Sequence, residues 1–212
     1  MPMSGVLGRL LEYWMSLPRS GSSLIPGRTA LQCNELLELM PRLALLKRLD
    51  RYNVQASMMN ISNSTILQNP LLGMNAFDLT APAIREQRAS FYEAVLDKPA
   101  VAQMRETVRQ QNGKEASVKS LYLPMADSRG EANYIIACTV YENRPEYNGI
   151  NDRLVLDHQN VQDLSFIDIG GGVPTVTFER QAPEVIKLSE HRWWSRLVPV
   201  RRKADAPNRL NA

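Results

Sequence analysis

The chain has 212 residues, and its shares of apolar (44%) and charged (22%) residues are close to those of ordinary globular proteins. A chain of this length buries a core without disulfides or metal ions, so we expect one domain with extensions. The formal net charge of +3 arises at the C-terminal end, where seven Lys and Arg residues accompany two acidic residues from Lys187 onward. The rest of the chain has no excess of positive charge, which argues against nucleic acid as a partner.

Cysteine usage and hydropathy indicate the compartment. Cys33 and Cys138 stand far apart with no CxxC spacing, so no disulfide is expected. No apolar stretch approaches the roughly 20 residues that cross a bilayer. Arg9 and Glu12 interrupt the apolar core that a signal peptide needs. The sequence therefore predicts a cytoplasmic protein.

Residues 4–17 predict an amphipathic helix, because apolar side chains recur there at spacings of three and four, at Leu7, Leu10, Leu11 and Trp14. This apolar stripe has two interpretations: it packs on the core of its own chain, or it forms an interface with a second copy. A connection rich in Pro, Gly and Ser then runs to about Thr29. A second helix is predicted over 30–40, ending before Pro41.

The period changes to two in the next segment. Residues 42–49 and 51–59 predict an antiparallel pair of strands, with one apolar face built from Tyr52, Val54, Ala56 and Met58. Residues 60–81 are too broken for a long element and suit one or two short helices. A helix is then predicted over 82–96, with Thr80 as its N-cap and Pro82 in its first turn.

The segment 119–141 predicts a β-hairpin, because two apolar runs flank the turn sequence ADSRGE. Asn112-Gly113 predicts another hairpin, which would join 101–111 to 114–125. A helix over 101–111 is the alternative, since its apolar residues also fit a helical period. On the last hairpin strand both faces are apolar, Tyr134 and Ile136 on one and Ile135 and Ala137 on the other. Beyond a loop, two short strands are predicted around the glycine-rich turn at 170–172.

Few residues indicate chemistry. His158 and His191 have no metal-ligand spacing, no GxSxG elbow is present, and we predict no metal site and no catalytic residues. The glycines at 170–172 suit a hairpin turn better than a phosphate loop, which needs a helix after it. Residues 187–203 combine Trp193 and Trp194 with basic residues, which suits either a weak contact with an anionic membrane or a solvated tail with a docked tryptophan pair.

Several short motifs, taken in order, resemble a known family. They are Tyr13-Trp14, Pro26-Gly27-Arg28, the run LMPRLALL at 39–46, Phe77-Asp78-Leu79-Thr80 and the run LYLPM at 121–125. Over residues 10–142 the chain resembles PAS domains, and in particular the short single-PAS proteins of alphaproteobacteria. It departs from them at Ala81-Pro82, where the family often has Gly.

The resemblance implies an α+β fold, a five-stranded antiparallel sheet with helices over one face, with an N-terminal helix and a C-terminal extension added to it. It divides the chain into an N-terminal amphipathic helix (1–18), a PAS-like domain (19–142), a β-rich extension (143–183) and a basic tail predicted to be disordered (184–212).

The resemblance also implies a non-enzymatic sensory or protein-interaction module. We expect a cytoplasmic signalling adaptor that acts on a signalling protein in trans and forms a homodimer through Leu7, Leu10, Leu11 and Trp14. The candidate cavity residues, which have plain core packing as their alternative, are Tyr52, Val54, Met58, Phe91 and Tyr134. Haem is not expected, because no histidine lies within 10–142, and covalent flavin is not, because its Asn-Cys-Arg-Phe motif is absent.

A small metabolite of unknown identity, or no ligand, remains. Two other classes stay open from the sequence: a small enzyme that uses the same cavity, and a scaffold bound to a membrane surface through the basic tail.

Overall fold

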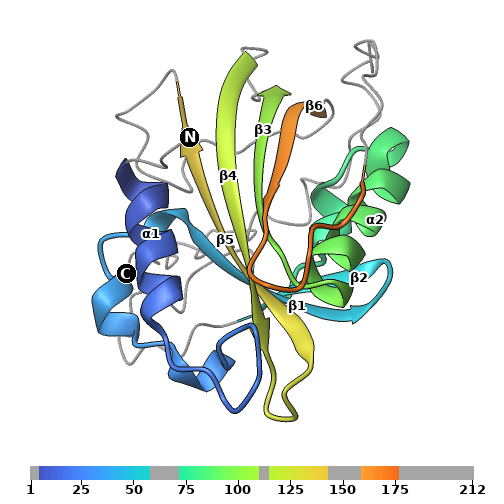
Figure 1. Cartoon of the computed structure of the whole chain (residues 1–212). Coiled ribbons are helices and arrows are strands. Elements are labelled where there is room, and N and C mark those ends of the chain that lie inside the picture. The colour runs from blue at the N-terminus through green and yellow to red at the C-terminus, as the bar shows by residue number, and fades with distance from the viewer. Residues whose placement is uncertain (1–4, 58–71, 110–114, 143–158, 177–212) are drawn as a thin grey trace, which may run out of the picture.

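The N-terminal helix and the second long helix lie on opposite sides of one sheet (Figure 1). The computed structural model describes residues 5–57, 72–109, 115–142 and 159–176. In this part of the chain no helix is both long enough and apolar enough to cross a membrane. Residues 187–203, for which a membrane contact was predicted, and both histidines lie outside the described ranges.

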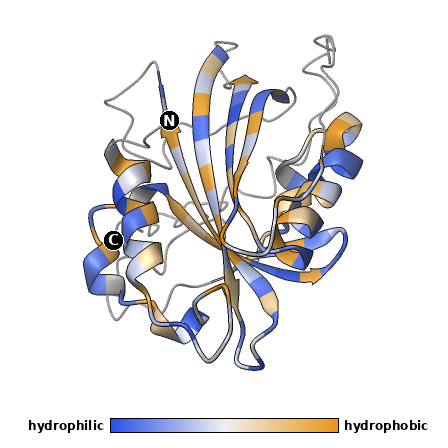
Figure 2. Cartoon of the chain, viewed as in Figure 1, coloured by the Kyte–Doolittle hydropathy of each residue, from blue (hydrophilic) through white to orange (hydrophobic). Residues whose placement is uncertain are grey.

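The sheet has six strands in the order β2-β1-β5-β4-β3-β6, and every neighbouring pair is antiparallel. The strands are β1 (Leu43–Asp50), β2 (Asn53–Ser57), β3 (Val101–Arg109), β4 (Glu115–Ala126), β5 (Ala132–Tyr141) and β6 (Gln159–Ile167). The predicted β1–β2 pair and both predicted hairpins are confirmed, and residues 101–109 form a strand rather than the alternative helix. Alternating hydrophobic and hydrophilic bands run along β3, β4 and β6 (Figure 2).

The helix α1 (Gly5–Ser16) confirms the first predicted element. The helix predicted over 30–40 is wrong: the segment forms short 3-10 turns, η1 (Arg28–Ala30), η2 (Cys33–Leu36) and η3 (Met40–Arg42). Leu36 and Leu39 are buried while Leu37 is exposed. Two buried residues three apart suit the three-residue turn, and Pro41 prevents a longer helix.

The helix α2 (Arg85–Asp97) confirms the third predicted helix, although its start differs. Ile84 is its N-cap, and Pro82 opens a separate 3-10 turn, η6 (Pro82–Ile84). Thr80 does not cap α2, because its hydroxyl donates to the carbonyl of Ala76 in the preceding turn η5 (Ala76–Leu79) at 2.9 Å.

The C-terminal extension adds its strand to the same sheet. β6 pairs with β3 and makes the sixth strand beside the predicted five. The second strand predicted after the glycine turn is absent at 173–176. Pro174 offers no N–H to a ladder, and the carbonyl of Val173 accepts a hydrogen bond from Lys98 Nζ at 3.2 Å instead of pairing with a strand.

Two cores lie on the two faces of the sheet. On the α1 face, Leu7, Leu10 and Trp14 pack against apolar side chains of β1, β4 and β5. On the α2 face, Phe91, Val95 and other residues of α2 pack against the alternate residues of the same strands and of β3. Residues of β5 therefore face both cores, as its two apolar faces predicted.

Candidate functional site: a buried ion pair under α2

Two charged side chains occupy apolar positions of the α2 face. Arg88 follows Ile84 by four residues and precedes Phe91 and Val95 by three and seven, so it lies on the buried side of the helix. On β3, Glu106 falls at the period of two that Met104 and Val108 share. Both the helix and the strand therefore direct a charge into a core that is otherwise mostly apolar.

Arg88 and Glu106 meet as an ion pair between α2 and β3. Arg88 Nη2 donates to Glu106 Oε1, and the two side chains are only 4% and 6% exposed. Arg88 Nη1 lies 3.2 Å from the sulfur of Met104, and the guanidinium carbon is 5.9 Å from the centre of the Phe91 ring. The pair is thus enclosed by a thioether and an aromatic ring, with little access to water.

Aromatic rings form the wall beside this pair. The ring of Phe91 meets that of Tyr122 edge to face, with centroids 4.8 Å apart, and lies 5.6 Å from Tyr92. Tyr92 in turn meets Phe77 edge to face at 5.9 Å. Such edge-to-face contacts stabilise the packing beyond the area buried, so the wall holds α2 at a defined position over the sheet.

Burial and charge shift the pKa values of this cluster. Burial opposes the positive charge of Arg88, but Glu106, Tyr122 and Tyr92 together outweigh it and keep the pKa of Arg88 above its ordinary value. Burial raises the pKa of Tyr122 and of Tyr92, and the positive charge of Arg88 offsets this only in part. At neutral pH Arg88 is therefore charged, and the phenols of Tyr92 and Tyr122 are neutral.

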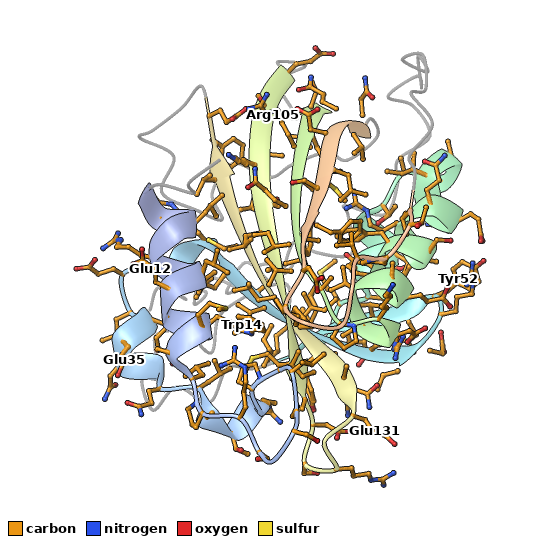
Figure 3. All side chains as sticks on the ribbon, viewed as in Figure 1. Glu12, Trp14, Glu35, Tyr52, Arg105 and Glu131 are labelled. Atoms are coloured by element: carbon orange, nitrogen blue, oxygen red, sulfur yellow. The ribbon has the colours of Figure 1, made fainter. Side chains whose placement is uncertain are left out.

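The structure brings together only part of the predicted cavity set. Val54 and Phe91 are buried in the α2 core, while Tyr134 lies in the α1 core on the other side of the sheet, under the guanidinium of Arg28. Tyr52 is 47% exposed, and its label in Figure 3 lies at the outer edge of the molecule beside α2. Met58 lies outside the described residues. The four described residues do not line one cavity, because the sheet separates Tyr134 from Val54 and Phe91 and the β1–β2 turn carries Tyr52 outward.

The predicted interface stripe is mostly core. Leu7, Leu10 and Trp14 are 3%, 0% and 0% exposed against the sheet, and only Leu11 is half-buried. The indole N–H of Trp14 donates to the carbonyl of Pro124 at 3.1 Å, and Figure 3 shows this side chain directed from α1 toward the strands. Within one chain, this stripe therefore packs on its own sheet and is not offered to a second copy.

Two surface hollows lie away from the ion pair. One, of about 460 Å³, lies near the tip of the β4–β5 hairpin and the end of α2, where Arg48 binds Asp97 at 2.5 Å. The other, of about 240 Å³, lies between α1 and the end of β6. No cluster of three or more potential metal-ligating His, Cys, Asp or Glu side chains occurs within the described ranges.

The sequence interpretation missed the ion pair, although a signal for it was present. Arg88 interrupts the apolar face of the predicted helix over 82–96, and Glu106 interrupts the apolar face of the strand that follows. A charge on each of two buried faces is a reason to expect that the two charges pair.

Comparison with known proteins agrees with this architecture. A family model described as PAS domain matches residues 4–140, from α1 to the end of β5. The chain belongs to this PAS-domain family, whose members are typically sensory rather than enzymatic, and it is accordingly a module of the sensory and signalling type.

Two solved structures are similar to the chain, both of VqmA from Vibrio cholerae. One is a complex of VqmA with ligand and DNA, 15% identical with a TM-score of 0.38. The other is a VqmA dimer without target DNA, 15% identical with a TM-score of 0.37. Each match covers 52% of this chain and 51% of the VqmA chain, about half of its length. None of the curated proteins matches the chain.

Proposed function

We propose that this chain is a non-enzymatic, cytoplasmic PAS-type sensor whose input acts on the Arg88–Glu106 pair and whose output passes to a signalling protein in trans. The observation that carries the proposal is the burial of this pair, with side chains 4% and 6% exposed in the core under α2. We further propose that the chain works as a homodimeric adaptor.

Stability alone does not account for a pair of this kind. Desolvation of two charges offsets most of their attraction, and well-packed apolar residues in place of a buried ion pair often leave stability unchanged or raise it by about 1–4 kcal/mol. Apolar residues already surround both positions, including Phe91, Val95 and Met104. If the Arg88–Glu106 pair responds to a charged ligand, its presence in an otherwise apolar core is explained.

The chemistry of the pair favours a small anionic ligand, a carboxylate or a phosphate ester. The guanidinium of Arg88 is permanently charged and its planar fork matches such groups in a bidentate manner. A ligand anion that replaces Glu106 leaves that carboxylate buried without its partner, which is strongly unfavourable. Glu106 must then move, and β3 or α2 shifts with it. Anion binding under α2 is thereby coupled to the shape of the domain surface.

The experiment combines ligand identification with a matched variant. Native mass spectrometry of the protein purified from its own host identifies any retained molecule, and thermal unfolding with a panel of small carboxylates and phosphate esters measures binding. A ligand at one hundred times its Kd stabilises the fold by about 2.7 kcal/mol. We expect this stabilisation in the wild type and its loss in Arg88→Met/Glu106→Leu, which keeps the volume and removes both charges.

Arg105→Met is the control, because Arg105 lies on the same strand but forms exposed ion pairs with Glu142 and Asp163. The control should respond to the ligand like the wild type. If no anion in the panel stabilises the wild type and no molecule is retained, or if the charge-free variant responds as the wild type does, the proposed input site is wrong.

A further inference from the structure

Exposed apolar side chains converge on one surface between α1 and β6. Met15 on α1, Leu24 in the following loop and Ile167 at the end of β6 are 54%, 38% and 38% exposed, and all three line the hollow of about 240 Å³. We call this surface the α1–β6 hollow. Its other apolar lining residues are Leu11, Val101 and Ile169. Large apolar side chains grouped around a hollow are typical of an interaction surface.

The walls of this hollow are held in place by local hydrogen bonds. Arg19 donates from Nε and Nη1 to the carbonyls of Leu24, Met15 and Leu17 at 3.0–3.1 Å. Asp168 Oδ1 accepts from the backbone N–H groups of Gly170 and Gly172 at 2.8 and 2.9 Å. Gly171 packs so closely on Leu24 that an added Cβ would lie 3.0 Å from its side chain. The hollow is therefore preformed in the single chain.

One cation and one carboxylate lie at this hollow; the Arg19 guanidinium is positioned 5.0 Å from the centre of the Trp14 ring, and one terminal atom of each group is left for a partner. Within the described part of the chain, Arg19 Nη2 and Asp168 Oδ2 make no hydrogen bond, and no ion pair joins the two residues although both line the hollow. A surface with one positive group, one negative group and an apolar centre is complementary to a copy of itself rotated about a two-fold axis.

We propose that the α1–β6 hollow docks a second copy of this chain as a two-fold symmetric homodimer. Met15, Leu24 and Ile167 of the two protomers form the apolar centre, and Arg19 of each protomer pairs with Asp168 of the other. Ile167, Asp168 and Ile169 lie beyond residues 4–140, which the family model matches, so three of the eight residues that line the hollow come from the segment that follows the matched PAS domain.

This interface leaves out Leu7, Leu10 and Trp14, the buried residues of the α1 stripe that the sequence suggested, and keeps from that stripe only Leu11, which lines the hollow. It rests on the proposed function only in naming a second copy as a partner of the adaptor. In this dimer, β6 contacts the second copy through its C-terminal end and its face, and not through the strand edge that is not paired with β3. That edge is interrupted at Gln162, where the register with β3 shifts, and carries Asp163, two features that disfavour strand addition.

The test is the oligomeric state of the full chain, measured without ligand by sedimentation velocity over a concentration series. We expect a dimer for the wild type. Met15→Glu and Ile167→Glu place like charges together at the two-fold centre and should each weaken dimerisation at least about tenfold. Asp168→Asn keeps the acceptor for the glycine turn but removes the charge, and should weaken it by a smaller factor.

Leu49→Glu is the matched control, because Leu49 is also exposed, at 49%, but lies on β1 away from the hollow. It should dimerise like the wild type. A wild type that is monomeric at every concentration overturns the proposal, and so do Met15→Glu and Ile167→Glu variants that dimerise as well as Leu49→Glu.

A second measurement needs no variant and remains decisive if the glutamate variants fail to fold. Hydrogen exchange of the wild type should slow with rising concentration at residues 11–24 and 165–169 and should stay constant at β1. Equal exchange at all concentrations overturns the proposal. None of these readouts involves an anion, so failure of the dimer and failure of the proposed input site are distinguishable.

Discussion

The two faces of the sheet are built differently. The α1 face is closed by apolar side chains around Trp14, whose single polar atom is satisfied by the carbonyl of Pro124. The α2 face carries both buried charges of the described part of the chain, Arg88 and Glu106, and also the buried hydroxyl of Ser120. Apolar packing responds weakly to ions and pH, whereas a buried ion pair responds strongly to any competing charge. One face therefore provides stability, and the other provides a site that a chemical signal can change.

The largest expected loss of stability is on the α1 face. Trp14 is fully buried, so Trp14→Ala should lower the free energy of unfolding by about 3–5 kcal/mol, with a further ~1 kcal/mol because the carbonyl of Pro124 loses its donor. Urea denaturation measures this. Trp14→Phe keeps most of the ring and should lose only about 1–3 kcal/mol. If both variants lose under ~1 kcal/mol, α1 does not anchor the sheet.

The second prediction separates charge from packing on the α2 face. Arg88→Met leaves the Glu106 carboxylate buried without a partner and should lower stability by about 3–5 kcal/mol, while Arg88→Met/Glu106→Leu should be neutral or more stable by about 1–4 kcal/mol. Urea denaturation of the full double-mutant cycle gives the coupling free energy. A double variant that is as unstable as the single variant would show that the pair serves packing, and the contrast between the two faces would fail.

The third prediction uses pH, because both faces contain groups that burial keeps neutral. Burial raises the pKa of the Cys138 thiol on the α1 face from 9.0 to about 12, and it raises the pKa values of Tyr92 and Tyr122 on the α2 face above 10.0. Each group binds its proton more tightly in the folded protein, so its contribution to stability is complete below the unfolded pKa and is lost as pH rises toward the folded one.

Urea midpoints measured from about pH 8 to pH 11 test this assignment. Stability should fall above about pH 9, and Cys138→Ala should remove the part of the fall that begins first. Tyr122→Phe should reduce only the part that begins near pH 10. A midpoint that stays level over the whole range would mean that these groups reach water in the folded protein.

Local patterns predicted much of the fold, and long-range contacts explain the rest. The turn sequence ADSRGE and the pair Asn112-Gly113 predicted both hairpins, and the pairing of β4 with β5 and of β3 with β4 confirms them. The helix predicted over 30–40 was wrong because the buried residues Leu36 and Leu39 lie three apart, which suits a 3-10 turn, and because Pro41 prevents a longer helix. The position of β6 beside β3 depends on a contact between distant segments, which no local pattern states.

The candidate site shows the same limit. Helical periodicity placed Phe91 on a buried face, and alternation placed Val54 and Tyr134, but the side of the sheet that each faces depends on where α1 and α2 pack. Arg88 and Glu106 each interrupted an apolar pattern, which marked them as unusual without showing that they meet. Their contact requires α2 to pack on the sheet within side-chain reach of β3, and packing of the whole core determines that position.

The smallest predicted effect concerns the second polar feature of the α2 face. Ser120 on β4 and Thr139 on β5 are cross-strand neighbours, and their hydroxyl oxygens lie 2.8 Å apart. Ser120→Ala leaves the Thr139 hydroxyl without this bond and should lower stability by about 0.5–1.5 kcal/mol. Ser120→Ala/Thr139→Val removes both hydroxyls and should recover part of that loss, because the Thr139 hydroxyl is no longer left unpaired, while Tyr122 still loses its hydrogen bond with Ser120.

This cycle, measured by urea denaturation beside that of Arg88 and Glu106, ranks the polar groups of the α2 face by what each pair contributes. Both single variants should be less stable than their doubles, and the difference should be several times larger for the charged pair, because desolvation of a charge is far more unfavourable than that of a hydroxyl. If the stability difference between single and double variants is equal for the two pairs, the charge of Arg88 and Glu106 has no effect beyond that of an ordinary polar pair. The sensor would then have to act through the shape of the core alone, since the neutral hydroxyl pair offers an anion nothing to displace.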